Sequence, residues 1–191
     1  MVHNGRFLLL FLILTTFSCG IFSTRDPEEP GTTSGSVFIP PDRATTVITN
    51  LKNAVRSMNS DHYLRSLSSD HFTFEPTADA QSRNSSLWNQ WGYIDESQYF
   101  GNLSSQTANR SGHELVLENE SYLSIDQTEQ FEAIYRLKIN HGESGIPEEA
   151  TGRMILILEQ DESGDWFIRS WADFENGSSF TWSDLRYSFY N

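Results

Sequence analysis

GRMILILEQDESGDWFIRSWADF, residues 152–174, is the stretch that decides the fold. An apolar run at 153–158 is followed by a turn at 161–165, and a second strand-like run extends from Trp166 to Phe174. Two such runs on either side of an Asp-, Ser- and Gly-rich turn are typical of a β-hairpin. Because the first run is apolar at successive positions, we expect its strand to be central in a sheet and covered on both faces.

Two earlier segments extend the same sheet. Residues 131–139 alternate between apolar and polar side chains, which is the pattern of a half-buried antiparallel strand. Residues 114–125 predict a further strand, joined to it by a turn near 126–128. The second half of the chain therefore predicts three or four long antiparallel strands.

The segment before these strands has helical periodicity. Apolar residues recur every three or four positions across 42–58, which predicts an amphipathic helix that begins near Pro41 and Asp42. The other elements expected before the sheet are a short helix at 61–68, a strand at 71–75 that Pro76 stops, and a helical piece around 87–91. After the strands, residues 179–190 predict a short helix or arm that packs back on the domain.

A capping box predicts where one more helix begins. Asp95 and Gln98 have the spacing at which each side chain can bond to the backbone of the other. Ile94 and Tyr99 stand at the positions of a hydrophobic staple around the same start. We therefore expect this helix to start at Asp95, with a structural role for the Asp95 carboxylate.

Helices followed by long antiparallel strands indicate an α+β domain. The stretches TVITNLKNAV (46–55), YLRSLSSDHFTF (63–74) and 152–174 resemble the nuclear transport factor 2-like group, which includes ketosteroid isomerase and the SnoaL-like polyketide cyclases. The resemblance implies N-terminal helices packed in a curved, mostly antiparallel sheet of four to five strands that forms a cone. Another half-open sheet-on-helix fold, such as a cystatin-like one, fits the same element order.

The N-terminus has the pattern of a secretory signal. Residues 7–17 are almost wholly apolar and follow Arg6 and the free amino group. As a helix these residues would rise about 16 Å, which is far short of the ~30 Å hydrocarbon core of a bilayer. A run of this length is typical of the apolar region of a signal peptide.

The end of that run, TTFSCG at 15–20, resembles the signal of bacterial lipoproteins. In that group a small-residue box precedes a cysteine, which is acylated and becomes the mature N-terminus. The resemblance implies lipidation at Cys19, with Ser18 before it, and anchoring that two or three acyl chains would make stable. Phe17 and Thr16 depart from the usual box. The alternative is ordinary signal cleavage, with Cys19 lost or left as a free thiol.

These features divide the chain into a signal peptide at 1–18, a lipid-anchored linker at 19–42, and one globular domain at 43–191. Four of the six prolines lie in the linker, so we expect it to be a semi-extended spacer. Gly20 resembles the residue that follows the cysteine in lipoproteins sent to the outer membrane. The expected location is therefore the bacterial cell envelope, and the resemblance at Gly20 implies the outer membrane.

Composition excludes several classes of protein. The formal charge is −13 and the basic residues are scattered, so no cluster exists that could neutralise nucleic-acid phosphates. Removal of residues 1–18 takes away Arg6 and leaves a mature charge of −14. A single cysteine rules out an internal disulfide and a multi-thiolate metal site. Five Asn-x-Ser motifs suggest a glycoprotein, but they also follow from a Ser-rich surface, and a glycoprotein would tend to contain disulfides.

Candidate catalytic residues are few. Asp173 lies on the last strand, and if its side chain faced inward, burial would raise its pKa and make it a usable base. A bulge in that strand would exchange its faces, so periodicity alone leaves the orientation of Asp173 open. His71 opens the short strand and could face the mouth of a cone. We expect no cofactor and no metal, because no metal-ligand spacing occurs among the histidines and acids.

Two functions fit these observations. The first is an exported, lipid-anchored protein whose domain binds a small apolar ligand or an envelope protein without catalysis. Tyr135, Tyr99 and Trp171 are the residues expected to line a ligand pocket. The second is an isomerase- or cyclase-like enzyme, which the resemblance implies and which needs a buried Asp or His. An interior filled by side chains would favour protein contact over ligand binding. The oligomeric state stays open.

Overall fold

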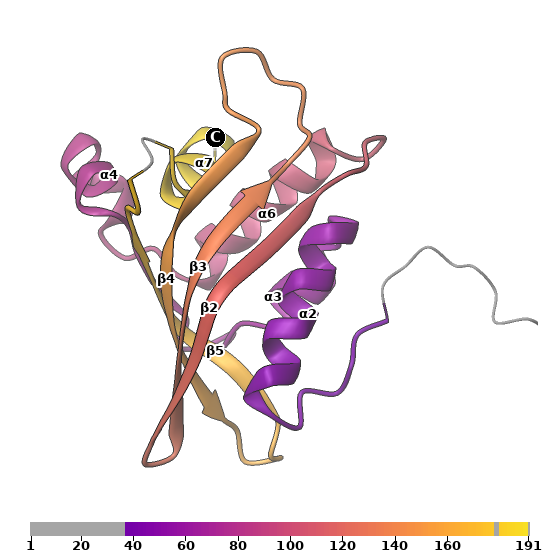
Figure 1. Cartoon of the computed structure of the whole chain (residues 1–191), viewed down its shortest axis with the longest axis vertical. Helices are drawn as coiled ribbons and strands as arrows, with labels where there is room; N and C mark the ends of the chain where they lie inside the picture. Colours follow the sequence, from indigo (N-terminus) through magenta and orange to yellow (C-terminus); the bar gives the residue numbers. More distant parts are fainter. Residues whose placement is uncertain (1–36, 178–179, 191) are drawn as a thin grey trace, which may run out of the picture. The chain divides into compact units, whose positions relative to one another are not determined.

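A computed structural model describes residues 37–177 and 180–190 (Figure 1). The expectations for the signal peptide, Cys19 and most of the linker therefore lie outside the described residues. No helix among the described residues is long and apolar enough to cross a membrane. The described part is an α+β domain, as the sequence predicts.

One mixed sheet of five strands organises the domain (Figure 1). The strands are β1 (Thr73–Glu75), β2 (Glu114–Ile125), β3 (Thr128–Lys138), β4 (Glu149–Gln160) and β5 (Trp166–Phe174). Their order is β1-β5-β4-β3-β2, and every pair is antiparallel except β1 with β5. The long strands twist and curve as they cross the domain, which confirms the expected mostly antiparallel, curved sheet.

The helices are short, except for two of fourteen residues. They are α2 (Ala44–Ser57), α3 (Ser60–Leu64), α4 (Ala78–Arg83), α5 (Ser85–Trp88), α6 (Tyr93–Gln106) and α7 (Trp182–Phe189). The apolar stripe expected at 42–58 is buried on α2, where Val47, Leu51 and Val55 have at most 1% of their surface exposed. Helix α4 was not expected from the sequence, and its Thr77 cap accepts a hydrogen bond from the Ala80 N–H at 3.2 Å.

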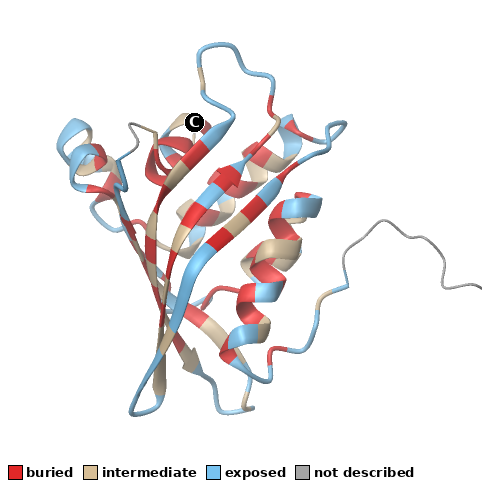
Figure 2. Cartoon of the chain, viewed as in Figure 1, coloured by how far each residue is buried: buried red, intermediate tan, exposed pale blue. Residues whose placement is uncertain are grey.

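Strand β4 is central, as predicted, but it is covered on one face only. Met154, Leu156 and Leu158 are fully buried on the inner face, while Ile155 and Ile157 on the other face are only half-buried. The continuous apolar run predicts cover on both faces, and this prediction is wrong. The burial colours in Figure 2 alternate along the strand for the same reason.

A bulge in β5 decides which side chains face inward. Ile168 pairs with Leu158 and Ser170 pairs with Ile157, so Arg169 is an extra residue between them. Strict alternation would place Ile168 and Trp171 on opposite faces. With the bulge, both side chains are fully buried, and so is Asp173.

Helix α6 begins earlier than the capping box predicts. Its first residue is Tyr93, and the extended Gly92 takes the N-cap position. Asp95 therefore lies inside the first turn, where its carboxylate accepts a hydrogen bond from the Gly92 N–H at 3.0 Å. The staple prediction is wrong as well, because Ile94 is 77% exposed.

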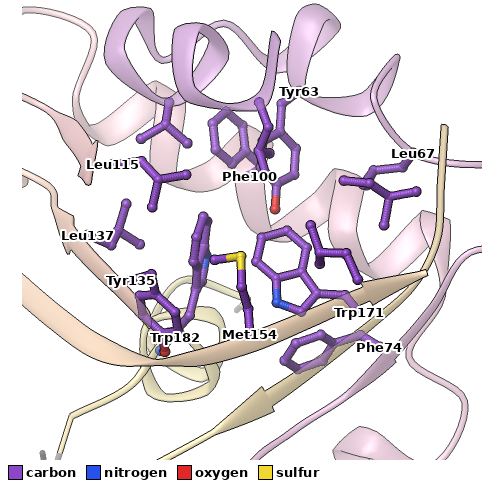
Figure 3. Packing of buried hydrophobic residues seen from close by; sticks show 14 of the residues in the cluster. Tyr63, Leu67, Phe74, Phe100, Leu115, Tyr135, Leu137, Met154, Trp171 and Trp182 are labelled. Atoms are coloured by element: carbon purple, nitrogen blue, oxygen red, sulfur yellow. The ribbon is translucent and has the colours of Figure 1, made fainter. Parts of the chain in front are cut away.

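Aromatic side chains fill the space between the sheet and the helices (Figure 3). Tyr63 from α3 stacks on Phe100 from α6, with their ring centroids 3.8 Å apart. Trp171 from β5 meets Trp182 from α7 edge-on at 4.6 Å. Large rings bury more apolar area per residue than aliphatic side chains, so these pairs dominate the core.

Candidate functional site

Asp173 faces the interior and is held by three hydrogen bonds. The Tyr135 hydroxyl donates to Oδ1 at 2.8 Å. The backbone N–H and the hydroxyl of Ser183 donate to Oδ2 at 2.8 and 2.6 Å. Burial raises the pKa of Asp173, and the hydrogen bonds from Ser183 and Tyr135 partly offset that rise.

These bonds attach the start of α7 to the sheet. Trp182 and Ser183 are the first two residues of α7, and their N–H groups have no partner inside the helix. The Trp182 N–H donates to the Tyr135 hydroxyl at 2.8 Å, and the Ser183 N–H donates to Asp173. A carboxylate at this position also interacts favourably with the helix dipole. Asp173 and Tyr135 therefore act together as the cap of α7.

The phenol of Tyr135 is held in its neutral form. Burial, and then the negative charge of Asp173, raise the pKa of Tyr135 well above its ordinary value. Its proton is donated to Asp173, and its oxygen accepts from Trp182. Both its donor and an acceptor position are thus already used within the protein.

A second buried centre joins α6 to α7 through an ion pair. Glu96 and Arg186 have no exposed surface. The Arg186 Nε lies 3.0 Å from both carboxylate oxygens, and Nη2 lies 2.8 Å from Oε1. Glu96 also accepts from the Tyr63 hydroxyl at 2.5 Å and from the Trp91 indole at 2.7 Å. Burial and Glu96 raise the pKa of Tyr63 well above its ordinary value.

Four aromatic rings surround the guanidinium of Arg186. Its Cζ lies 3.9 Å from the ring centroid of Phe74 and 4.4 Å from that of Trp171. Trp182 and Tyr99 are farther, at 5.3 and 5.5 Å. These distances are within the range of cation–π attraction. The Arg186 Nη1 and the Trp171 Nε1 are buried without a hydrogen-bond partner among the described residues.

The three residues expected to line a ligand pocket surround Trp182 instead. Tyr99 accepts a hydrogen bond from the Trp182 indole at 3.0 Å. Tyr135 and Trp171 meet the Trp182 ring edge-on at 5.6 and 4.6 Å. All three are at most 1% exposed, and Figure 3 shows Tyr135 and Trp171 beside Trp182 of α7.

His71 lies on the outside, in the connection from α3 to β1. The structure does not bring it to Asp173. It lines an open groove of about 760 Å³ between that connection and the β4–β5 turn. We call this the hairpin groove; besides His71, its wall includes Phe38, Tyr93, Glu162, Asp165 and Trp166.

Two other histidines are buried at the same end of the β2–β3 pair, where β2 begins and β3 ends. His113 accepts from the Asn140 N–H at its Nδ1 (3.3 Å), and its Nε2 lies 3.2 Å from the Arg110 carbonyl oxygen. The His141 Nδ1 accepts from the Glu143 N–H at 3.0 Å. Through these contacts both rings fasten the loops beside them. Among the described residues, no group of His, Cys, Asp and Glu could hold a metal ion.

Sequence reasoning missed Glu96 and Arg186, which form the most buried polar contact of the domain. A signal was present for Arg186. It lies four residues after Trp182 and three before Phe189, which places it on the apolar face of the predicted C-terminal helix. A cation on such a face needs a buried partner, because an unpaired charge there is costly.

Comparison with known protein families and with characterised proteins finds no match. Among solved structures, a nuclear transport factor 2 (NTF2-like) superfamily protein from Salmonella enterica superposes with a TM-score of 0.54 at 12% identity, covering 71% of this chain and 89% of that one. ActVI-ORFA from Streptomyces coelicolor gives 0.52 at 8% identity, with 70% and 93% covered. A conserved protein from Planctomyces limnophilus gives 0.52 at 15% identity, with 68% and 91% covered.

These likenesses show the fold, which is NTF2-like, as the resemblance of the three stretches implies. They extend to no function, because the identities are too low for active-site residues to be carried over.

Proposed function

We propose that this protein is an exported, lipid-anchored cell-envelope protein whose NTF2-like domain binds a partner protein through its surface, without catalysis. The observation that carries the binding role is the filled interior. Trp182 and Arg186 of α7 occupy the space between sheet and helices, and each inner acid is bonded to structural groups. A partner would therefore meet the outer surface of the domain.

Support for the anchor comes from the sequence around Cys19 and from the way the domain begins. Asn50 on α2 accepts from the Ile39 N–H at 3.0 Å and donates to the Ile39 carbonyl oxygen at 2.7 Å. Phe38 lies under the Arg65 guanidinium at 3.9 Å. The chain is thus fastened to the domain at residues 38 and 39, near the end of the linker, which is where a tether would join the domain. Val37, just before them, is 79% exposed.

Mass spectrometry of the mature N-terminus tests the anchor. We expect a chain that begins at Cys19 and carries acyl chains in the membrane fraction. The C19A variant should show no acyl mass. An unmodified N-terminus at another residue in the wild-type protein would refute lipidation.

A protein of residues 20–191 allows a test of the filled interior. The measurement follows the indole NMR signals of Trp171 and Trp182 in that protein. Titration with a steroid or a fatty acid should leave both signals in place, because no room is available beside them. A saturable shift of both signals would show that an apolar ligand enters the interior, and would contradict the proposal of surface binding.

One observation favours the alternative of an isomerase- or cyclase-like enzyme. Asp173 is a buried acid with a raised pKa beside a tyrosine, as such an enzyme requires. To accept a substrate proton, however, Asp173 would have to release Ser183 and part of the α7 cap. Turnover of any enolisable ketone that the D173N variant abolishes, while its fold persists, would establish the enzyme.

A further inference from the structure

We infer that the hairpin groove binds an extended segment of a partner protein that carries lysine or arginine side chains. This inference rests on the proposed function and names the surface and the chemistry of the partner. The groove has a volume of about 760 Å³, which is in the range of pockets that bind specific ligands.

The groove lies between two parts of the chain that are far apart in sequence. One wall is the connection from α3 to β1, which the Ser68 N–H attaches to the Ile168 carbonyl oxygen at 2.9 Å. The other wall is the β4–β5 turn, which Asp161 holds closed by accepting from the Ser163 and Asp165 N–H groups at 2.9 and 3.0 Å. Both walls are therefore fixed by hydrogen bonds, so the groove is present before a partner arrives.

The lining of the groove is strongly acidic. Five carboxylates and one arginine line it, which gives a formal charge of −4 with histidine neutral. The five acids are Asp70, Glu159, Asp161, Glu162 and Asp165. A concave surface lined by one sign of charge concentrates ions of the other sign. The occupant that this lining favours is a cation.

The acids differ in whether they are already engaged. Glu159 pairs with Arg169 at 2.6 Å, and Asp161 accepts the bonds of the turn. Glu162 and Asp165 are exposed, and their carboxylates have no hydrogen bond or ion pair within the described residues. Arg65 is also engaged, by Asp61 at 3.8 Å and by the ring of Phe38. Uncompensated negative charge therefore remains on the turn, facing the groove.

Aromatic side chains lie beside these acids. Tyr93, Trp166 and Phe167 line the groove and are half-buried, so part of each ring is accessible. A lysine ammonium or an arginine guanidinium gains from contact with an aromatic face as well as from a carboxylate. The presence of both aromatic rings and carboxylates distinguishes this groove from a surface that is only acidic.

The occupant is a segment of another protein rather than part of this one. Linker residues 20–36 include one basic residue, Arg25, and three acidic residues, Asp26, Glu28 and Glu29. This part of the linker is therefore negatively charged, like the groove. A second copy would bring a formal charge of −13. Four of the five carboxylates follow one another along the β4–β5 wall and Asp70 lies on the other wall, which suits several cations along an extended chain.

Phe38 and Pro41 line the groove, so it adjoins the point where the linker joins the domain. Seventeen residues lie between Cys19 and Val37, and fully extended this segment spans at most about 65 Å. An anchored domain would therefore present the groove within that distance of the membrane surface, plus the size of the domain itself.

Titration with labelled peptides tests the inference. The full-length protein, in nonionic detergent, is titrated by fluorescence anisotropy with a peptide of four lysines spaced by Gly-Ser, and with the same peptide carrying glutamates. We expect saturable binding of the lysine peptide alone, with an affinity that falls as salt rises. The Trp166 indole signal should shift on binding, while that of Trp182 should stay in place.

A matched pair of variants separates the groove from the general negative charge. E162Q/D165N removes two carboxylates at one end of β4, and E143Q/E148Q removes two exposed carboxylates near its other end. We expect the first variant to weaken binding at least fivefold and the second to change it less than twofold. Equal weakening in both, no binding, or equally tight binding of spermidine at the same site would overturn the inference. Because the acyl mass at Cys19 is read independently, failure of the groove and failure of the anchor can be told apart.

Discussion

Arg186 and Glu96 form a bidentate ion pair between α7 and α6, and neither side chain has any surface exposed to solvent. Removal of one partner from such a pair typically costs about 3–5 kcal/mol, because the other charge stays buried and unpaired. Replacement of both partners can be much less costly. The pair is therefore more important for the position of α7 than for net stability.

We expect the R186M variant to lower the free energy of unfolding by about 3–5 kcal/mol, measured by denaturant unfolding. R186K should also destabilise, because an ammonium cannot reproduce the bidentate contact. The double variant E96Q/R186M should lose less than the sum of the two single variants. Additive losses would show that the two side chains do not interact.

The cap of α7 predicts a second coupled pair. Y135F leaves the Trp182 N–H without its acceptor and removes one of the three hydrogen bonds to Asp173, and D173N disturbs the bonds from Ser183. Each change should cost about 1–3 kcal/mol of unfolding free energy. The double variant should cost less than the sum, in a thermodynamic cycle. S124A, on the exposed end of β2, serves as a control that should change little.

Substitution of Gly152 should cause a steric clash, and substitution of Gly101 serves as a matched control. A Cβ at this position would overlap the Tyr135 hydroxyl and approach the Phe174 carbonyl oxygen to 2.7 Å. G152A should therefore destabilise the domain by about 1–3 kcal/mol. A Cβ at Gly101 on α6 meets nothing within 4 Å, so G101A should stabilise by about 0.5–1 kcal/mol. Thermal unfolding should show a lower melting temperature for G152A and a higher one for G101A than for the wild type.

His113 predicts a loss of stability in mild acid. Burial lowers its pKa below the ordinary value of 6.5, so the unfolded chain binds the proton more readily than the folded one. Its contribution is fully present above pH 6.5 and falls as the pH drops from 6.5 to the lowered pKa. Asp173 acts with the opposite sign, because its raised pKa favours the folded state at low pH. Compared at pH 7.5 and 5.5, H113Q should lose less stability than the wild type.

The sequence predicts the strands of the sheet better than it predicts the contacts of the buried polar residues. Strands β2 and β5 have the predicted ends, because their limits coincide with turn residues such as Asp126 and Gly164. Local patterns also predict α2. The bulge at Arg169 has no local signal, since the extra residue depends on the register with β4.

The candidate site residues also differ in how far local sequence patterns predict them. Asp173 was identified as a possible inner acid, but its role as the cap of α7 depends on Ser183, ten residues later, and on Tyr135 from another strand. The partner of Arg186 is ninety residues away in sequence. Periodicity indicates which face of an element is apolar, but it does not indicate which distant residue meets a buried charge.

The position of α7 after all five strands in the sequence has a consequence for folding during synthesis. A polypeptide that is synthesised or translocated N-terminus first delivers Glu96, Asp173 and the sheet before it delivers Trp182 and Arg186. Until those last residues arrive, two carboxylates lack their native partners and the aromatic interior stays open to water. Folding of the domain is therefore complete only once residues 182–189 are available, and a chain truncated before Trp182 should leave the aromatic interior open to water.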